Sequence, residues 1–85
     1  MSHYDVDKEV SLISEHMKRL GTKQADGSYK CTFGHLFNDD TVTQTFESLV
    51  GSLKAAKKRG VINFEGQMLL MPTHKDVMLT LLPGK

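Results

Sequence analysis

Apolar positions near the start of the chain recur with the period of an amphipathic helix. They stand three or four residues apart, at Val6, Val10, Ile13, Met17 and Leu20. Acidic residues fill the first turn and Lys18 and Arg19 lie in the last, as the helix dipole favours. Gly21 follows the last apolar position and is typical of a helix stop. We therefore expect a helix from about residue 5 to residue 20.

A second and longer helical pattern begins at Thr41. Thr41 and Gln44 have the spacing of a capping box, in which each side chain bonds to the backbone of the other. Apolar residues then form one face, at Val42, Phe46, Leu49, Val50, Leu53 and Ala56. Basic residues close the last turn before Gly60, which marks the C-terminal end. We expect one helix over residues 41–59, and a close helix crossing would explain Gly51 inside it.

Residues 28–32 alternate with the two-residue period of a strand. They follow Asp26-Gly27, a strong turn signal. The next segment, Phe33–Phe37, is long enough for one helical turn, with Thr32 as its cap. We expect a short strand that is followed directly by a short helix.

The helical period ends at Gly60. Residues 61–64 are rich in strand-forming side chains and predict a short strand or an extended lead-in. Two further apolar runs, 68–71 and 77–82, are separated by the polar residues 72–76. We expect these two runs to pair as an antiparallel hairpin, with residues 72–76 as its loop.

The expected order of elements is helix, strand, short helix, long helix and hairpin. This order is typical of an α+β fold with a winged-helix-like three-helix core and a small antiparallel sheet. The 85 residues suffice for a single domain, residues 1–85. Its predicted core comes from the two longer helices and the hairpin: Val10, Ile13, Met17, Leu20, Phe46, Leu49, Val50, Leu53, Leu69 or Leu70, and Leu79 or Leu81.

Charge and cysteine content narrow the class of protein. The net charge of +1 argues against a dedicated nucleic-acid or membrane-surface binder. The single cysteine, Cys31, excludes an intrachain disulfide and indicates a reducing compartment. The N-terminal residues lack the pattern of a signal peptide, and the apolar run 68–71 is far too short to span a membrane. We expect a cytoplasmic protein.

Two groups of residues have the chemistry of a catalytic or metal site. Cys31 and His35 could be a metal-binding pair, or a nucleophile with its base. A structural zinc site needs a second pair, however, and Cys31 lies on a predicted strand where its thiol would be buried and inert. Asp39 and Asp40 precede a predicted helix and are more typical of caps than of an acid–base pair. We expect no metal, no cofactor and no activity that depends on Cys31.

The one chemical feature above background is a cluster of basic residues at the end of the longer helical pattern: Lys54, Lys57, Lys58 and Arg59. Complementation of the helix dipole at a solvated end accounts for two or three of these charges. Alternatively, the cluster is a docking patch for an acidic partner, where charge steers and orients association. We expect all of these side chains to be exposed, because the opposite face of the helix is directed at the core.

Several stretches of the chain are similar to one known family. The sequence FESLVGSLKAAKKRG, which runs from Phe46 to Gly60, is the most specific of them. The others are Glu9–Gly21, Asp26-Gly27, Phe33–Asp40 and Val61–Leu82. In these stretches the chain resembles the costars family, a small domain also found at the C-terminus of the actin-binding Rho-activating protein of striated muscle. The resemblance covers about residues 5–82.

The resemblance implies a winged-helix-like fold and a non-enzymatic role in actin dynamics and cell motility, in the cytoplasm and at the cytoskeleton. The implied partner is actin or an actin-regulatory protein, and we expect the chain to be a monomer. The basic cluster suits such an acidic partner, so we expect the partner-binding residues to be Lys54, Lys57, Lys58 and Arg59. The chain departs from the family at His74-Lys75-Asp76, where an acidic residue is expected directly after the histidine.

The alternative is a nucleic-acid-binding winged helix. In that case the long helix would enter a groove through Gln44, Glu47 and Ser48, with residues 72–76 as the wing. Glu47 and the preceding Asp39-Asp40 would repel phosphates, and the net charge of +1 weakens this alternative further. The sequence has no feature that tests a third alternative, an accessory subunit of an enzyme.

Overall fold

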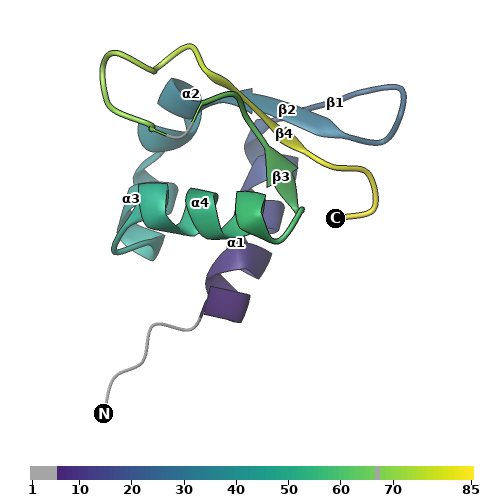
Figure 1. Ribbon diagram of the computed structural model, residues 1–85, viewed down its shortest axis with the longest axis horizontal. Coiled ribbons are helices and arrows are strands. Elements are labelled where there is room, and N and C mark those ends of the chain that lie inside the picture. The colour runs from purple at the N-terminus through teal and green to yellow at the C-terminus, as the bar shows by residue number, and fades with distance from the viewer. Residues whose placement is uncertain (1–5, 67) are drawn as a thin grey trace.

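The computed structural model describes residues 6–66 and 68–85, in which helices cover one face of a small antiparallel sheet (Figure 1). The helices are α1 Val6–Leu20, α2 Phe33–Phe37, α3 Asp40–Thr45 and α4 Leu49–Lys58. The strands are β1 Thr22–Lys23, β2 Tyr29–Thr32, β3 Ile62–Asn63 and β4 Met78–Leu81. The predicted α+β class is confirmed, and the likeness to a winged helix stays a prediction.

The last strand, β4, is an inner strand of the sheet, whose order is β1-β2-β4-β3. It pairs antiparallel with β2 on one side and with β3 on the other. The predicted hairpin between residues 68–71 and 77–82 is therefore wrong, because β2 and β3 occupy both hydrogen-bonding edges of β4. The short strand predicted at residues 61–64 is confirmed by β3.

Helix α1 ends where the sequence predicts, but Gly21 acts there in a different way. Gly21 is not among the glycines with positive φ, so it is not a left-handed cap. A Cβ on Gly21 would lie 2.6 Å from the carbonyl oxygen of Met17 and 2.9 Å from that of Lys30. Only glycine fits at this position, because the end of α1 and strand β2 approach so closely here.

Strand β2 runs directly into α2, as expected. The Thr32 hydroxyl accepts a hydrogen bond from the backbone N–H of His35 at 3.2 Å, which confirms Thr32 as the cap. Phe33 and Leu36 are buried, whereas Phe37 is exposed at the end of the turn.

The single helix predicted over residues 41–59 is wrong, because the chain breaks it into α3 and α4 at Phe46. Phe46 has extended backbone angles, φ −107° and ψ 132°, and its ring meets that of His16 edge-on at 5.8 Å between centroids. Asp39, not Thr41, caps α3 by accepting from the N–H of Val42 at 3.0 Å. The threonine hydroxyls of α3 bond to its own carbonyl groups, and threonine is a weak helix former.

Ser48 begins the new helix and explains Gly51. The Ser48 hydroxyl accepts from the N–H of Gly51 at 3.1 Å, which caps α4. A Cβ on Gly51 would lie 3.0 Å from that same hydroxyl oxygen. The glycine therefore leaves room for the cap of its own helix, and a crossing with another helix is not the reason for it.

The C-terminal end of α4 at Gly60 is confirmed. Gly60 has φ 75°, a left-handed conformation that favours glycine. Its N–H donates to the carbonyl oxygen of Lys57 at 3.0 Å, and the N–H of Val61 donates to that of Ala56 at 2.9 Å. These two bonds form a Schellman motif, which turns the chain from α4 into β3.

The predicted core is largely confirmed. Leu20 and Val50 are only half-buried, and of the paired alternatives Leu69 is buried whereas Leu70 is exposed. The other predicted members are all buried: Val10, Ile13, Met17, Phe46, Leu49, Leu53, Leu79 and Leu81. Further buried residues complete the core, most of them from the short elements: Phe33, Leu36, Val42, Ala56, Ile62 and Phe64.

An ion pair connects the end of α1 to the start of α3. Arg19 donates from Nη2 to Oδ2 of Asp39 at 2.7 Å, and that same oxygen caps α3. The hydrogen bond from Arg19, together with that from the backbone, lowers the pKa of Asp39. The interpretation of Asp39 as a cap is therefore confirmed.

Replacing Leu49 with Ala should destabilise the domain by about 2–5 kcal/mol, because it removes a buried side chain and leaves a cavity. Thermal and urea unfolding measure this change. Leu70→Ala is the matched control, since Leu70 is 51% exposed and its truncation should change stability by no more than about 0.5 kcal/mol. Equal stability of the two variants would contradict the assignment of the core face.

Replacing Asp39 with Asn should make the stability of the protein less dependent on pH in the acid range. The folded-state pKa of Asp39 is lowered, so its ion pair stabilises the protein above the ordinary pKa of about 3.9. That stabilisation is lost as the pH falls through the lowered pKa. Asn still caps α3, so the variant isolates the charge. Melting temperatures between pH 4 and pH 2 should fall more steeply for the parent, and parallel curves would contradict this prediction.

Candidate interaction surface

The basic residues at the end of α4 have three different environments. Lys54 and Lys58 are exposed, and neither forms an ion pair with any residue in 6–66 or 68–85. Lys57 is half-buried, and Arg59 is exposed but paired. The prediction that all of them project freely into solvent is therefore wrong for Lys57, and Arg59 is only partly available.

Lys57 connects α4 to residues 64–66, which follow β3, through hydrogen bonds. Its Nζ donates to the carbonyl oxygen of Phe64 at 2.6 Å and to that of Gly66 at 2.8 Å. The same ammonium lies 4.3 Å from the centroid of the Phe64 ring, which is itself buried. Lys57 is therefore a structural residue that holds residues 64–66 in place.

Arg59 pairs with Asp7, and the pair connects the end of α4 to the first turn of α1. Both side chains are exposed, so the pair contributes little to stability. The Asp7 carboxylate nevertheless cancels much of the charge of Arg59. Lys54 and Lys58 are thus the two cations of the predicted patch that remain available to a partner.

A shallow groove of about 640 Å³ lies between α4 and the segment after β3. It is lined by Lys54, Lys57, Lys58 and Phe64. Lys54 and Lys58 are four residues apart on α4, so they stand one helical turn apart on the same side of the helix. The groove therefore has a fixed spacing of two positive charges along one wall.

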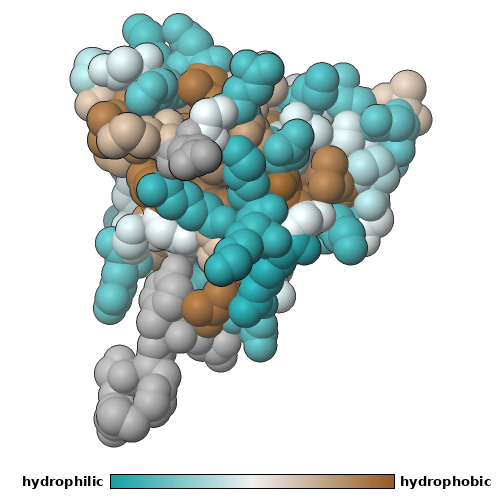
Figure 2. All heavy atoms as spheres, viewed as in Figure 1, coloured by the Kyte–Doolittle hydropathy of each residue, from teal (hydrophilic) through white to brown (hydrophobic). Residues whose placement is uncertain are grey.

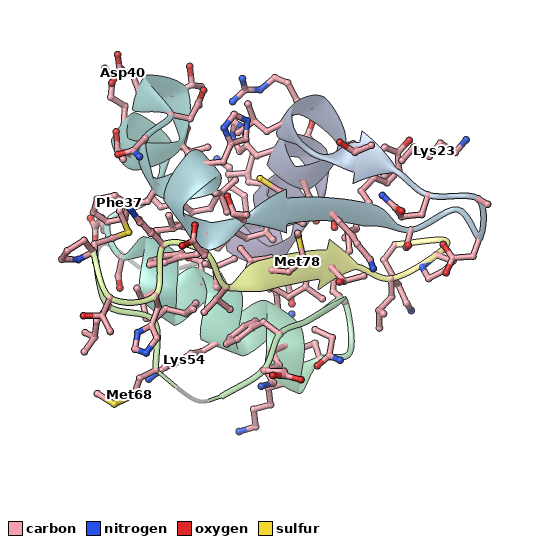
Figure 3. The ribbon with its side chains drawn as sticks, turned by 90° about the horizontal axis from the view of Figure 1, so that it is seen from above. Lys23, Phe37, Asp40, Lys54, Met68 and Met78 are labelled. Carbon is pink, nitrogen blue, oxygen red and sulfur yellow. The ribbon has the colours of Figure 1, made fainter. Side chains whose placement is uncertain are left out.

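Two exposed apolar side chains, Met68 and Leu70, follow the groove in the chain, at 58% and 51% exposure. Figure 3 shows Met68 and Lys54 projecting on the same side of the molecule, beside α4. Figure 2 shows apolar atoms at the upper left, over the loop between β3 and β4, next to hydrophilic atoms. The prediction of a strand over residues 68–71 did not identify these residues as part of a surface. The run Met-Leu-Leu-Met is apolar throughout, so its pattern does not distinguish the exposed positions from the buried Leu69.

The loop that carries Leu70 is held by hydrogen bonds at both ends. The Leu70 N–H donates to Nδ1 of His74 at 2.9 Å, and the His74 N–H donates to the Leu70 carbonyl oxygen at 2.7 Å. Further along, the Gly34 N–H donates to the carbonyl oxygen of Lys75 at 2.8 Å, where a Cβ on Gly34 would collide with that oxygen. These hydrogen bonds hold the backbone at Leu70 and at Lys75.

Cys31 and His35 differ in their exposure to solvent. Cys31 is buried and burial raises the pKa of its thiol to about 11, which leaves very little reactive thiolate at neutral pH. His35 is exposed on α2.

Among residues 6–66 and 68–85, no cluster of three or more His, Cys, Asp or Glu side chains could hold a metal ion. Nor does any helix in these ranges have the length and apolar character needed to cross a membrane.

Replacing Lys57 with Met should destabilise the domain by about 1–3 kcal/mol, because the carbonyl groups of Phe64 and Gly66 lose a charged donor. Lys58→Met is the matched control, because Lys58 is exposed and its loss should change stability by no more than about 0.5 kcal/mol. Urea unfolding of both variants measures the difference. If Lys57→Met were as stable as Lys58→Met, Lys57 would not have this structural role.

Comparison with known proteins agrees with this architecture. The Costars family model matches residues 5–82. The chain is 55% identical to Protein costars of Dictyostelium discoideum over 78 residues, which cover 92% of this chain and 95% of that protein. It is 49% identical to Costars family protein ABRACL of Homo sapiens, with 92% of this chain and 96% of that protein covered.

A solved structure is also similar. The solution structure of human HSPC280 protein matches with a TM-score of 0.81 and 48% sequence identity, and the match covers 93% of each chain. The similarity therefore extends from the family pattern in the sequence to the arrangement of helices and strands. On these grounds the chain belongs to the Costars family.

Proposed function

We propose that this protein is a non-enzymatic, cytoplasmic regulator of actin dynamics that acts as a monomer by binding actin or an actin-regulatory protein. Membership of the Costars family supports this role, through the family's resemblance to a domain of the actin-binding Rho-activating protein. The observation that carries the proposal is the pair of exposed lysines on α4, Lys54 and Lys58, which form no ion pair with any residue that the structure describes.

The net charge of the protein is only +1, so it can attract an acidic partner only through a local patch of positive charge. Charges at the rim of an interface act mainly on the association rate and its salt dependence. Actin has a strongly acidic outer surface, so two free lysines on one side of a helix can orient the domain against it. The groove beside them provides the remaining contact area.

Nucleic-acid binding through the longer helical pattern has less support. The proposed reading face consisted of Gln44, Glu47 and Ser48, but the break at Phe46 places Gln44 on α3 and Ser48 at the start of α4. The Ser48 hydroxyl caps α4 by accepting a hydrogen bond from the N–H of Gly51. These residues therefore do not form one continuous face of a single helix.

Reversing the two free charges, in a Lys54→Glu/Lys58→Glu variant, should weaken association with filamentous actin by about tenfold at low salt. The effect should shrink as salt screens the charges. Co-sedimentation with and without an actin-severing factor distinguishes direct binding from binding through a regulator. Lys57 is left unchanged, because its replacement would disturb the fold.

The matched control is Lys18→Glu/Lys23→Glu, which reverses two exposed lysines away from the groove. Figure 3 shows Lys23 at the end of the molecule opposite Lys54. Both double variants lower the net charge from +1 to −3, since each replacement removes one positive charge and adds one negative charge. If the two variants associate equally, the surface on α4 is not the binding site.

A further inference from the structure

We infer that the groove beside α4 receives an acidic amphipathic helix of a partner protein, whose apolar side chains rest on Met68 and Leu70 while its carboxylates meet Lys54 and Lys58. The inference rests on the proposed function, because it names the chemistry of the partner at the same surface. It adds that apolar contact, as well as charge, holds the partner there.

The apolar part of the surface is two residues on one short segment. Met68 and Leu70 flank Leu69, which is 2% exposed and anchors the segment in the core. Single exposed apolar residues are common on protein surfaces. Here two large ones follow in the chain the groove that Lys54 and Lys58 border, and Figure 3 shows Met68 on the same side of α4 as Lys54. Together they match the apolar centre and polar rim of an interface.

Hydrogen bonds hold residues 64–66 and Leu70, which lie on either side of Met68 in the chain. Lys57 holds residues 64–66 through two carbonyl groups, and His74 holds Leu70 through two hydrogen bonds. A preorganised surface loses little conformational entropy on binding, so its contacts contribute more to affinity. Met68 and Leu70 are therefore well placed to act as apolar anchors.

The spacing of the cations favours a helical partner. Lys54 and Lys58 are separated by about 6 Å along the axis of α4, from a rise of about 1.5 Å per residue. Carboxylates four residues apart on a second helix have the same separation. Docking of an amphipathic helix into a groove is an established mode of peptide recognition, read through apolar anchors on one face.

Other anionic partners fit this surface less well. A nucleic-acid backbone needs a row of cations, whereas a second hollow that Phe64 also lines has Glu65 and Asp76 beside the single cation Lys30. An anionic membrane gains only about 1 kcal/mol from each nearby lysine. Two lysines and two apolar side chains therefore match a short protein segment better than either of these surfaces.

A synthetic peptide tests the inference directly. The probe is an amphipathic helix with Leu on one face and Glu residues four apart beside it, and its matched control has Gln in place of each Glu. Fluorescence anisotropy should show that the protein binds the Glu peptide and binds the Gln peptide at least about tenfold more weakly.

Variants of the protein separate the two kinds of contact. Met68→Ser/Leu70→Ser should weaken binding of the Glu peptide by about tenfold or more while its salt dependence stays the same. Lys54→Glu/Lys58→Glu should remove binding of the Glu peptide. Met78→Ser is the control, since Met78 is 46% exposed on β4, and it should bind as the parent does. Thermal melts confirm that each variant is folded.

The outcomes separate this inference from the proposed function. If the protein binds the Glu peptide through these residues but does not associate with actin or its regulators, the inference stands and the proposed function fails. If Lys54→Glu/Lys58→Glu weakens actin association while Met68→Ser/Leu70→Ser does not, and the peptide does not bind, the inference is overturned and the proposed function stands.

Two further results would overturn the inference. One is binding to phosphatidylserine vesicles that the Met68→Ser/Leu70→Ser variant loses, which would assign the surface to a membrane. The other is a dimer in analytical ultracentrifugation that the same variant abolishes, which would assign the surface to a second copy of the chain.

Discussion

Strand β4 lies between β2 and β3, and this position at the end of the chain connects both halves of the fold. Its residue Leu79 pairs with Cys31 in β2, and Leu81 pairs with both Tyr29 in β2 and Ile62 in β3. Leu79 and Leu81 are buried between the sheet and the helices. In the chain, β1 and β2 come after α1, and β3 comes directly after α4. The packing of the sheet against the helices therefore depends on β4 being inserted between β2 and β3.

The same arrangement produces the candidate interaction surface. Once β2 and β3 occupy both edges of β4, residues 68–71 have no strand with which to pair there. They cross the outside of the core instead, with Leu69 buried and its two neighbours exposed. The exposed apolar pair is therefore a consequence of the sheet order, and two hydrogen bonds with His74 hold the backbone of Leu70.

Positive charge in this protein has two separate tasks. Lys57 satisfies carbonyl groups that follow β3 and stabilises the groove wall, and Arg59 joins α4 to α1 through Asp7. Of the four basic residues at the end of α4, Lys54 and Lys58 are exposed and form no ion pair with any residue in 6–66 or 68–85, which leaves them available to a partner. The structural charges form the groove and the free charges border it, so a partner would meet a rigid surface whose local charge exceeds the net charge of the chain.

Local sequence patterns suffice to predict the elements whose ends depend on near neighbours. The Thr32 cap and the Gly60 stop act on backbone groups only a few residues away, so local patterns identified α2 and the end of α4. The partners of β4, and the break at Phe46 beneath α1, were decided only in the tertiary structure. The sequence likewise identified the basic cluster, but could not tell the structural Lys57 from its exposed neighbours. That distinction depends on where residues 64–66 cross α4, because a lysine becomes structural only when carbonyl groups distant in the chain come within reach of its ammonium.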